Sequence, residues 1–219
     1  MTMKRTRHDN VMMDGRRLYT VNLVPGEVVY GERLSKDKGH EIRQWDPARS
    51  KLGAAIMKNM SLPKLKRSDA WLYLGASSGT TASHVSDIVD DGMIYAVEFA
   101  PRVMRELHFL AKKRMNLAPI FADANKPDSY SHLISGVDIL FQDIAQREQV
   151  DIFLKNFRFL KENGTAILSC KSRSIDVGAK PKEIFRRIEK QLKDACELIE
   201  YKTLEPFEQD HAVFLCKKR

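Results

Sequence analysis

One segment, residues 72–81, places the strongest constraint on how this chain can fold. Its sequence, LYLGASSGTT, is an apolar run that breaks into a turn rich in glycine and serine and then continues as a segment with helical character. Gly75 and Gly79 allow unusual backbone angles and close approach, and the free N–H groups of the following helix would face a ligand. The pattern is typical of a strand, loop and helix that hold a nucleotide-like cofactor.

A second strand-like run, residues 93–97, is followed at once by Glu98. A carboxylate at the end of a second strand suits a ribose, because it can accept hydrogen bonds from both hydroxyl groups of the diol. Ser77 occupies the place of the second glycine in the G-x-G-x-x-G pattern, so the loop alone does not match that pattern fully. Glu98 strengthens the interpretation.

After Asp69, short apolar runs alternate with amphipathic segments. This alternation predicts an α/β fold with a mainly parallel sheet and helices on both faces. The expected strands are 71–74, 93–97, 118–121, 137–142 and 165–169, and the expected helices start at 81 and 101 or span 150–160 and 181–192, with a short helical turn near 127–133. Residues 198–204 and 212–216 read as two strands with no room for a crossover helix, which predicts a hairpin at the sheet edge and an antiparallel last strand.

The start of the chain has a different character. Strand-like pieces at 18–24 and 28–33 flank Pro25 and Gly26, and a turn at 36–39 precedes another at 42–45. A helix over 49–60 would connect these pieces to the sheet and carry Lys51. We therefore expect a small N-terminal β module in residues 1–48 and a cofactor-binding α/β domain in residues 49–219.

Positive charge is concentrated in the first third of the chain. The 219 residues have a formal net charge of +8, and residues 1–67 hold 15 Lys and Arg against 7 Asp and Glu, whereas residues 68–219 hold 22 of each. A basic region beside a cofactor-binding sheet favours a polyanionic substrate. The alternative is a basic surface that only aids solubility.

Targeting signals and cysteine usage point to the cytosol. No apolar run approaches the length of a membrane span, and the polar, basic start lacks the apolar core of a signal peptide. Cys170, Cys196 and Cys216 are odd in number and too far apart for a zinc site. We expect reduced, mostly buried thiols.

Several polar residues follow the predicted strands, where an open α/β sheet binds its ligands. Asp123 follows the third strand, Asp143 the fourth and Lys171 the fifth. Each has an alternative interpretation, since an acid after a strand often caps the next helix and a strand-end lysine is often solvated. We expect Lys171 to be partly desolvated and to be held by Asp143. His211 opens the last strand, where a lone histidine is more often structural.

Seven strings in the sequence together resemble archaeal fibrillarins in order and spacing. They cover nearly the whole chain beyond the first ten or so residues: NLVPG (22–26), VYGER (29–33), WDPARSKL (45–52), GTTASHVSD (79–87), EFAPR (98–102), DIAQ (143–146) and KSRSID (171–176). The sequence starts almost directly at the expected β module, without the Gly/Arg-rich leader of eukaryotic fibrillarins, which favours the archaeal form.

The resemblance implies a Rossmann-like fold of S-adenosylmethionine-dependent methyltransferases and methylation of ribose 2′-hydroxyl groups in ribosomal and transfer RNA. It also implies work inside a box C/D ribonucleoprotein, where a guide RNA selects the target nucleotide. The expected protein partners are a coiled-coil scaffold of the Nop type and, indirectly, a ribosomal-type protein that binds kink-turns. No metal and no membrane are implied.

The same resemblance assigns the site. The catalytic set would be Lys51, Asp143, Lys171 and His211, with Lys171 accepting or stabilising the proton of the hydroxyl and Asp143 near the sulfonium of the cofactor. The cofactor site would be lined by Gly75, Thr80, Thr81, Glu98, Phe99, Asp123, Ala124, Asp143, Ile144, Ala145 and Gln146, with Phe99 covering the adenine.

Rival functions stay open at this point. One is a methyltransferase of small molecules or of protein glutamine, and the other is a structural ribonucleoprotein subunit with a vestigial cofactor site. The absence of an evident metal cluster and the basic first third disfavour a catechol-type substrate. A vestigial site predicts loss of Asp143 or Lys171, and both residues are present.

Overall fold

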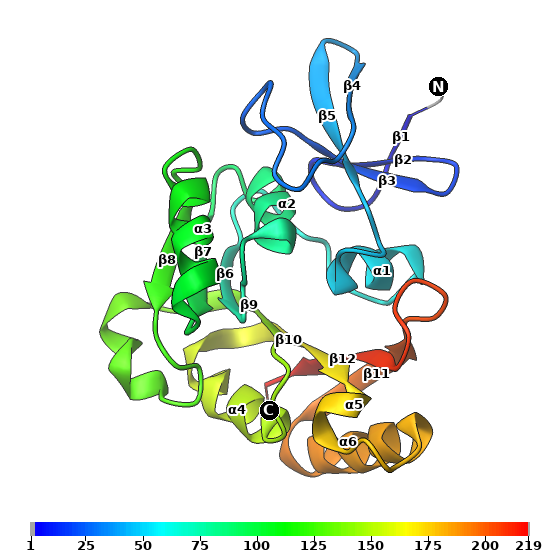
Figure 1. Ribbon diagram of the computed structural model, residues 1–219, viewed down its shortest axis with the longest axis vertical. Coiled ribbons are helices and arrows are strands. Elements are labelled where there is room, and N and C mark those ends of the chain that lie inside the picture. Colours follow the sequence, from blue (N-terminus) through cyan, green and yellow to red (C-terminus); the bar gives the residue numbers. More distant parts are fainter. Residues whose placement is uncertain (1–2, 219) are drawn as a thin grey trace.

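The computed structural model describes residues 3–218 and consists of two β-sheets with helices packed around the larger one (Figure 1). The N-terminal strands form the smaller sheet, and α1 (Lys51–Met57) lies where the chain passes to the larger sheet. Within the part of the chain that the structure describes, no helix is long and apolar enough to span a membrane.

The small sheet is antiparallel throughout, with the strand order β1-β2-β3-β5-β4. Lys38 and Gly39, with φ of 46° and 86°, form the tight turn of its last hairpin, because two-residue hairpin turns favour left-handed backbone. The strands are β1 (Lys4–Arg5), β2 (Val11–Asp14), β3 (Arg17–Val21), β4 (Leu34–Asp37) and β5 (His40–Trp45).

The predicted strand at 28–33 is wrong. The Glu32 carboxylate accepts hydrogen bonds from the backbone N–H groups of Val29 and Tyr30 at 2.8–3.1 Å, and Gly31 has a φ of 88°. The segment therefore curls around one side chain instead of extending. The strand expected over 18–24 ends at Val21, and the first two strands of the sheet, β1 and β2, were not predicted.

The large sheet has the order β11-β12-β10-β9-β6-β7-β8. Strands β6 to β10 run parallel, whereas β12 runs antiparallel to both of its neighbours, as the sequence predicts. The direction of winding reverses between β6 and β9, and ligands of open α/β sheets sit beyond the strand ends at such a point. The strands are β6 (Ala70–Leu74), β7 (Met93–Glu98), β8 (Leu117–Phe121), β9 (Val137–Asp143), β10 (Leu160–Lys171), β11 (Glu197–Thr203) and β12 (His211–Lys217).

Helices cover both faces of the large sheet. Apolar side chains of α1, α2 (Thr80–Ile88) and α3 (Pro101–Ala111) join one buried cluster, and those of α4 (Gln149–Lys155) and α6 (Pro181–Ala195) join the other. Figure 1 shows the two groups on opposite sides of the strands. Shorter elements are the helix α5 (Ser172–Ile175) and the 3₁₀ turns η1 (Pro127–Ser129), η2 (Ser131–Leu133) and η3 (Asn156–Phe159).

The helix expected over 150–160 stops at Lys155 and gives way to η3. Asn156 explains the change, because its amide donates to the carbonyl groups of Ile152 and Ala124 at 2.8 and 3.0 Å and competes with a continued helix. Strand β10 then begins at Leu160, earlier than predicted, and the helix expected over 49–60 is shorter at both ends.

A buried charge network joins the small sheet to α2 and to the turn that follows α3. The Arg43 guanidinium, fully buried, lies 3.3 Å from carboxylates of Glu32 and Asp87, and Arg114 lies 2.7 Å from Asp87. Burial and the two arginine charges hold the pKa of His84 well below its usual range, so its ring is neutral. The network fixes the small sheet against the larger one.

The division between residues 48 and 49 remains a proposal. It follows the strand pairing, since β1 to β5 pair only with one another. The apolar core crosses this boundary, because Val11, Leu18 and Trp45 pack in the same cluster as Trp71 and Tyr73 of β6. We therefore expect the N-terminal module to depend on the larger domain for its stability.

Candidate active site

The loop between β6 and α2 requires glycine at its first position. Gly75 has a φ of +79°, and a Cβ atom there would lie 2.5 Å from the carbonyl oxygen of Asp143 and 2.5 Å from a methyl group of Ile144. Only glycine lets β6 and β9 carry their following loops so close together. Gly79, with a φ of +97°, then caps the start of α2.

Glu98 ties this loop to the end of β7. Its carboxylate is 93% buried and accepts hydrogen bonds from the N–H groups of Ser77, Phe99 and Ala100, each at 2.9 Å. Two of these bonds reach Oε1 and one reaches Oε2. A carboxylate oxygen has two lone pairs, so Oε2 keeps acceptor capacity for a ligand hydroxyl. The Glu98 carboxylate can therefore accept fewer hydrogen bonds from a ribose than the sequence predicts, because both of its oxygens already accept from backbone N–H groups.

A pocket of about 310 Å³ lies beside Glu98. Every residue predicted for the cofactor lines this pocket, except Thr80 and Thr81. Ser77, Val97 and Ala122 line it as well. The Phe99 ring is 58% exposed. Asp123 also accepts the N–H of Asn125 at 2.9 Å, so it stabilises its own turn as well as lining the pocket.

The four predicted catalytic residues meet in an adjoining pocket of about 410 Å³, which we call the catalytic pocket after this prediction. Lys51 comes from α1, Asp143 from the end of β9, Lys171 from the end of β10 and His211 from the start of β12. The register explains the gathering: Ser169 of β10 pairs with Asp143, and Lys171 pairs with His211. The two pockets share Gly75, Ser77, Asp143, Ile144 and Ala145, and Thr80 and Thr81 line the second.

Lys51, rather than Lys171, is the ion-pair partner of Asp143. The Lys51 Nζ atom lies 3.5 Å from Asp143 Oδ2 and 3.7 Å from Glu208 Oε1. The expected desolvation of Lys171 and its expected contact with Asp143 are both wrong: its side chain is exposed, and no hydrogen bond or ion pair reaches it from any residue the structure describes. Its amine is therefore available to a substrate.

The ring of His211 is held by its own loop. It is 7% exposed, and its Nδ1 atom lies 2.6 Å from the carbonyl oxygen of Gln209. A carbonyl can only accept, so Nδ1 carries the proton and donates it to this bond. In the neutral ring, Nε2 is then the acceptor. Glu208 Oε2 lies 3.7 Å from the same Nδ1.

Ser50 and Thr81 fix the helix that carries Lys51. The Ser50 hydroxyl caps α1 by accepting from the N–H of Gly53 at 3.2 Å, and it accepts a second hydrogen bond from Thr81 Oγ1 at 2.9 Å. Both residues are buried. The Thr81 hydroxyl thus points to the start of α1. If Thr81 contacts the cofactor as predicted, it does so through its backbone.

Sequence reasoning missed three further residues of the catalytic pocket with functional side chains, Arg49, Tyr73 and Glu208. Tyr73 is 98% buried in β6, and burial, with a smaller contribution from the Asp143 charge, raises the pKa of its phenol well above the usual range. The phenol therefore stays a hydrogen-bond donor at neutral pH. Tyr73 carries no signal in the sequence, because it reads as one more apolar strand residue. Glu208 could have been noticed from its spacing, three residues before His211.

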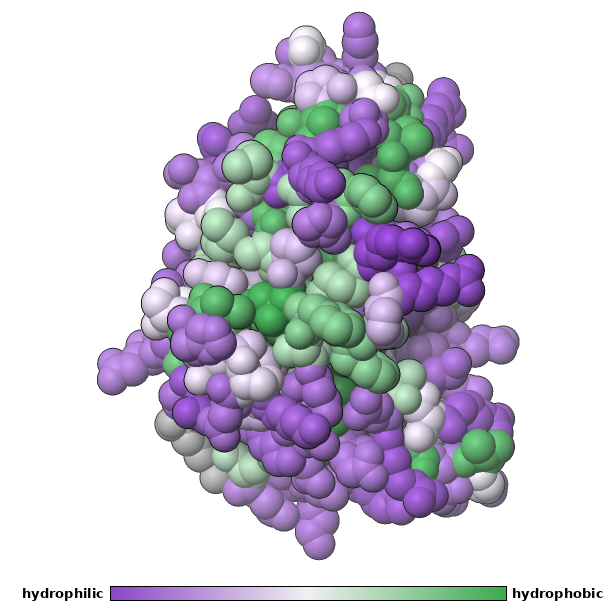
Figure 2. All heavy atoms as spheres, turned by 60° about the vertical axis from the view of Figure 1, so that its left-hand side comes forward, coloured by the Kyte–Doolittle hydropathy of each residue, from purple (hydrophilic) through white to green (hydrophobic). Residues whose placement is uncertain are grey.

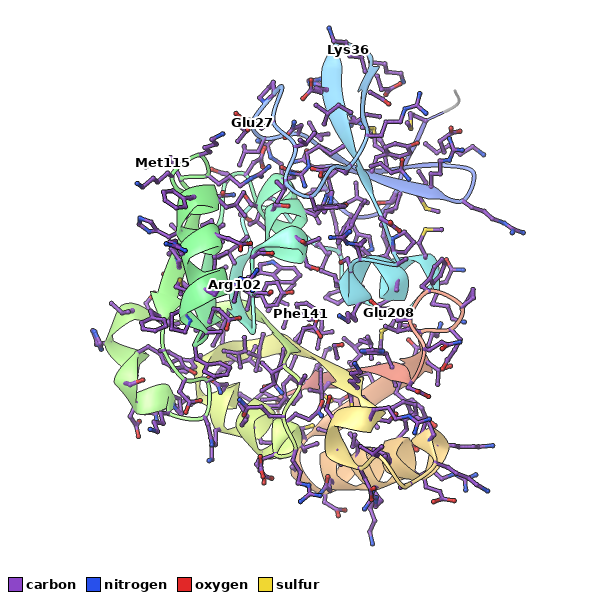
Figure 3. All side chains as sticks on the ribbon, in the orientation of Figure 1. Glu27, Lys36, Arg102, Met115, Phe141 and Glu208 are labelled. Carbon is purple, nitrogen blue, oxygen red and sulfur yellow. The ribbon has the colours of Figure 1, made fainter. Side chains whose placement is uncertain are left out.

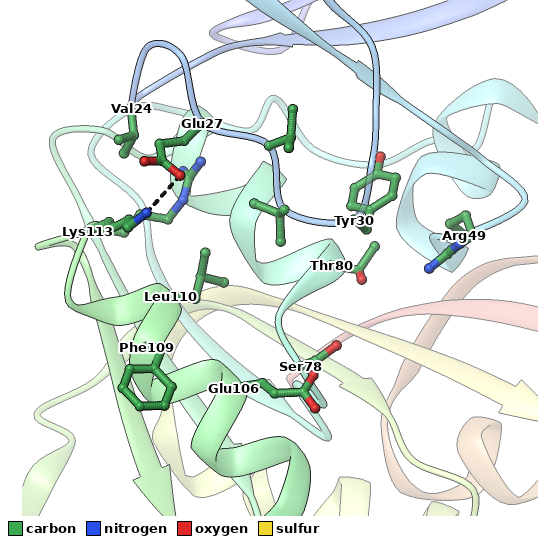
Figure 4. Close-up of a pocket in the computed structure, with 13 residues that line it drawn as sticks. Val24, Glu27, Tyr30, Arg49, Ser78, Thr80, Glu106, Phe109, Leu110 and Lys113 are labelled. Carbon is green, nitrogen blue, oxygen red and sulfur yellow. Dashed lines mark ion pairs between the residues drawn. The ribbon is translucent and has the colours of Figure 1, made fainter.

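A third pocket, of about 520 Å³, is lined in part by residues of the N-terminal module (Figure 4). It lies between the 24–30 loop and α3, where Lys113 pairs with Glu27 at 2.8 Å. It shares Arg49 and Thr80 with the catalytic pocket. The Arg49 guanidinium is exposed and lies 5.4 Å from the centre of the Tyr30 ring. A cation thus stands where the two pockets meet.

Figure 2 shows apolar side chains gathered on the face of the molecule that carries α3 and β8. The large exposed apolar residues of these elements and their flanking loops are Phe99, Phe109, Met115 and Phe121, each more than half exposed. Phe99 also lines the 310 Å³ pocket. One of these exposed residues thus belongs to the pocket lining, and exposed apolar surfaces commonly serve as binding sites.

Comparisons with known proteins agree on one family. The fibrillarin family model matches residues 2–219. A fibrillarin-like rRNA/tRNA 2′-O-methyltransferase of Methanosarcina barkeri is 53% identical over 212 residues, covering 94% of this chain and 93% of the relative. The crystal structure of Aeropyrum pernix fibrillarin with natively bound S-adenosyl-L-methionine is 44% identical, with a TM-score of 0.86 over 99% of this chain and 98% of that one. A fibrillarin from a fibrillarin/Nop5p complex is 38% identical, with a TM-score of 0.90 over 99% and 100%.

Proposed function

Because the chain belongs to the fibrillarin family, we propose that it methylates the 2′-hydroxyl of ribose in ribosomal and transfer RNA, with S-adenosylmethionine as its cofactor. One observation carries the proposal. A cofactor-sized pocket beside Glu98 opens into a second pocket that holds Lys51, Asp143, Lys171 and His211, and Asp143 lines both. A methyl donor in the first pocket and a ribose in the second would meet at Asp143.

The residues of the first pocket suit S-adenosylmethionine. Gly75 leaves room for close approach to the backbone, Glu98 Oε2 keeps acceptor capacity for a ribose hydroxyl, and Phe99 offers an exposed ring to the adenine. The cofactor supplies a methyl group on a positively charged sulfonium. Asp143 would hold that charge at the boundary of the two pockets, and Gln146, Ile144 and Ala145 would line the remaining wall.

In the second pocket the chain's own residues would position the hydroxyl. Transfer to an oxygen needs an in-line approach, so most of the acceleration comes from holding the two partners in place. Lys171 Nζ, which has no partner among the described residues, would accept or stabilise the hydroxyl proton. Lys51 and His211, which line the same pocket, would help to fix the ribose.

The partners follow from the family and from the surface. We propose that a box C/D guide RNA selects the target nucleotide and that Arg49 and the basic N-terminal third contact RNA phosphates. A coiled-coil scaffold of the Nop type would dock on the apolar surface around Phe99, Phe109 and Phe121, and a kink-turn-binding protein would anchor the guide RNA. The relatives are archaeal, and we place the particle in the archaeal cytoplasm.

A reconstituted particle tests this function. The chain, the scaffold, the kink-turn protein and a guide RNA are mixed with a matched or a mismatched target, and methyl transfer is followed with time. We expect efficient transfer only to the matched target and poor transfer by the isolated chain, because phosphate contacts carry little sequence information. Site-selective methylation by the chain alone would contradict the ribonucleoprotein proposal. Methylation of protein glutamine instead of RNA would favour the rival methyltransferase, and no transfer at all would favour a structural subunit.

A further inference from the structure

Glu208 contacts two of the four residues of the catalytic set. Its Oε1 atom lies 3.7 Å from Lys51 Nζ, and its Oε2 atom lies 3.7 Å from His211 Nδ1. The side chain lines the catalytic pocket and is 19% exposed. Figure 3 shows Glu208 in the loop after β11, beside α1. One carboxylate therefore spans an amine from near the start of the chain and an imidazole from near its end.

The loop that carries Glu208 is firmly held. The N–H of Leu204 donates to the carbonyl of His211 at 2.9 Å, and the N–H of Phe207 donates to the carbonyl of Leu204 at 2.9 Å. Leu204 is fully buried, and Phe207 packs against the same core cluster as α1. Lys58, next to the end of α1, donates to the carbonyl of Glu205 at 2.9 Å. The fold thus presents Glu208 to the pocket from a fixed backbone.

The position of Lys51 explains why a second carboxylate matters. Its amine lies between Asp143 at 3.5 Å and Glu208 at 3.7 Å. Opposite charges at such distances attract each other, the more so because all three side chains are largely shielded from water. Without Glu208 the amine would be drawn to Asp143 alone. Asp143 would then be turned toward the lysine and away from the cofactor pocket.

We propose that Glu208 is a positioning residue for the methyl transfer, which rests on the function proposed above. Its carboxylate draws the Lys51 amine away from Asp143, and so keeps Asp143 directed at the boundary of the two pockets. This role depends on the charge of residue 208 and acts through Lys51. A structural role of the loop would depend on neither.

Single-turnover methylation in the assembled particle, at saturating cofactor, tests the proposal. Glu208→Gln keeps the shape and removes the charge, and Glu208→Asp keeps the charge on a shorter side chain. Glu205→Gln is the matched control, since Glu205 lies in the same loop, is exposed and does not line the pocket. Lys51→Gln, alone and combined with Glu208→Gln, completes a double-mutant cycle. Calorimetry gives the cofactor affinity of each variant, and thermal melting shows whether it is folded.

We expect Glu208→Gln to lower the rate by about tenfold, a size within the range that directly coupled neighbours show. Glu208→Asp should recover most of that loss, and Glu205→Gln should match the parent. Cofactor affinity and melting temperature should not change. In the Lys51→Gln background, Glu208→Gln should cost less than about twofold, because the residue it acts through is gone.

Three results would overturn the proposal: a parent-like rate for Glu208→Gln, a full tenfold loss in the Lys51→Gln background, or a loss explained by weaker cofactor binding. A parent particle that transfers no methyl group would instead contradict the proposed function. In that case the contact is still testable by NMR of the His211 ring. Glu208→Gln should shift those ring signals and Glu205→Gln should not, and unmoved ring signals for Glu208→Gln would contradict the positioning role.

Discussion

Glu98 combines two roles in one side chain. Its carboxylate satisfies the N–H groups of Ser77, Phe99 and Ala100, and its second oxygen keeps acceptor capacity for a ligand. Replacing Glu98 is therefore expected to weaken both the stability of the loop and the binding of its ligand. Measurements on this residue therefore need a readout of folding beside the readout of binding.

Glu98→Ala should weaken S-adenosylmethionine binding. Loss of a hydrogen bond between a buried carboxylate and the ribose costs about 1–3 kcal/mol, and the three N–H groups left without their acceptor should lower stability as well. Calorimetry measures the affinity and urea unfolding measures the stability. Glu106→Ala on α3 is the control, because Glu106 lines the third pocket and not the cofactor pocket. Unchanged cofactor affinity in Glu98→Ala would place the ribose elsewhere.

Lys171→Ala should remove most of the methylation rate and leave cofactor binding nearly intact. Loss of a general base costs on the order of 10²–10⁴-fold, and Lys171 does not line the cofactor pocket. Lys171→Arg should rescue little, because the planar fork of a guanidinium places its charge and its donors differently from an amine. Lys161→Ala, at the other end of β10 and in an exposed pair with Asp138, should match the parent in single-turnover assays. A parent-like rate for Lys171→Ala would reduce Lys171 to a solvated strand-end residue.

Among the elements, the loop between β6 and α2 depends most on one residue. Gly75 and Gly39 both have positive φ, at +79° and +86°, but a Cβ atom at Gly39 meets nothing within 4 Å, whereas one at Gly75 would clash with the backbone of Asp143. The two glycines therefore separate backbone strain from steric exclusion.

Gly39→Ala should cost about 1–2 kcal/mol of unfolding free energy from the left-handed backbone alone and leave cofactor affinity unchanged. Gly75→Ala should cost more and abolish measurable cofactor binding, because β6 and β9 must move apart. Urea unfolding and calorimetry on the two variants decide this. Equal effects of the two substitutions would show that the close approach of the loop to Asp143 is not required.

The large sheet could be predicted from the sequence element by element, since each of its parallel strands is an apolar run bounded by polar residues. The strand predicted over 28–33 does not form, because its side chains make other contacts: the Tyr30 hydroxyl lies 2.8 Å from His84 Nε2, and the Glu32 carboxylate accepts from the N–H of Tyr30. The helix predicted over 150–160 ends at Lys155, because the Asn156 side chain donates to a carbonyl of the preceding turn. In both cases a polar side chain decides the local structure, and hydrophobic periodicity does not record it.

Part of the site could be predicted in the same way. Glu98, Asp143 and Lys171 follow strands and are candidates by their positions, whereas the roles of Lys51 and His211 are predicted through the family resemblance. The contacts of Ser50 with Thr81 and of Glu208 with Lys51 join residues far apart in the chain. No spacing rule brings such pairs together, so they become visible only in the folded structure.

Two buried histidines make the stability of the protein depend on pH. Burial, with the Arg7 charge, lowers the pKa of His8 to about 4, and burial with Arg43 and Arg114 holds the pKa of His84 well below its usual range. The unfolded chain takes up protons on these rings below about pH 6.5, while the folded chain does not. Acid therefore favours the unfolded state.

The unfolding free energy should fall as the pH drops from 6.5 toward 4, by up to about 1.4 kcal/mol per pH unit for each histidine. Urea unfolding at several pH values measures the slope. The N–H of Leu65 donates to His8 Nδ1 at 3.2 Å, and His8→Asn keeps an acceptor there. This variant should lower the slope of free energy against pH by up to about 1.4 kcal/mol per pH unit, the contribution of one proton. A free energy that does not change between pH 6.5 and 4.5 would contradict this assignment.

The two sheets share one core, which holds the cofactor pocket beside the catalytic pocket for one reaction. Isotope tracing of the product tests whether this reaction is methylation of a ribose 2′-hydroxyl. The assembled particle is incubated with a cofactor carrying a deuterated methyl group, and the target RNA is digested to nucleosides for mass spectrometry. We predict that the label appears as a 2′-O-methyl group on the nucleotide selected by the guide, and that a 2′-deoxy residue at that position abolishes it. Label on a base, on protein glutamine or on the RNA with the 2′-deoxy target would contradict the account.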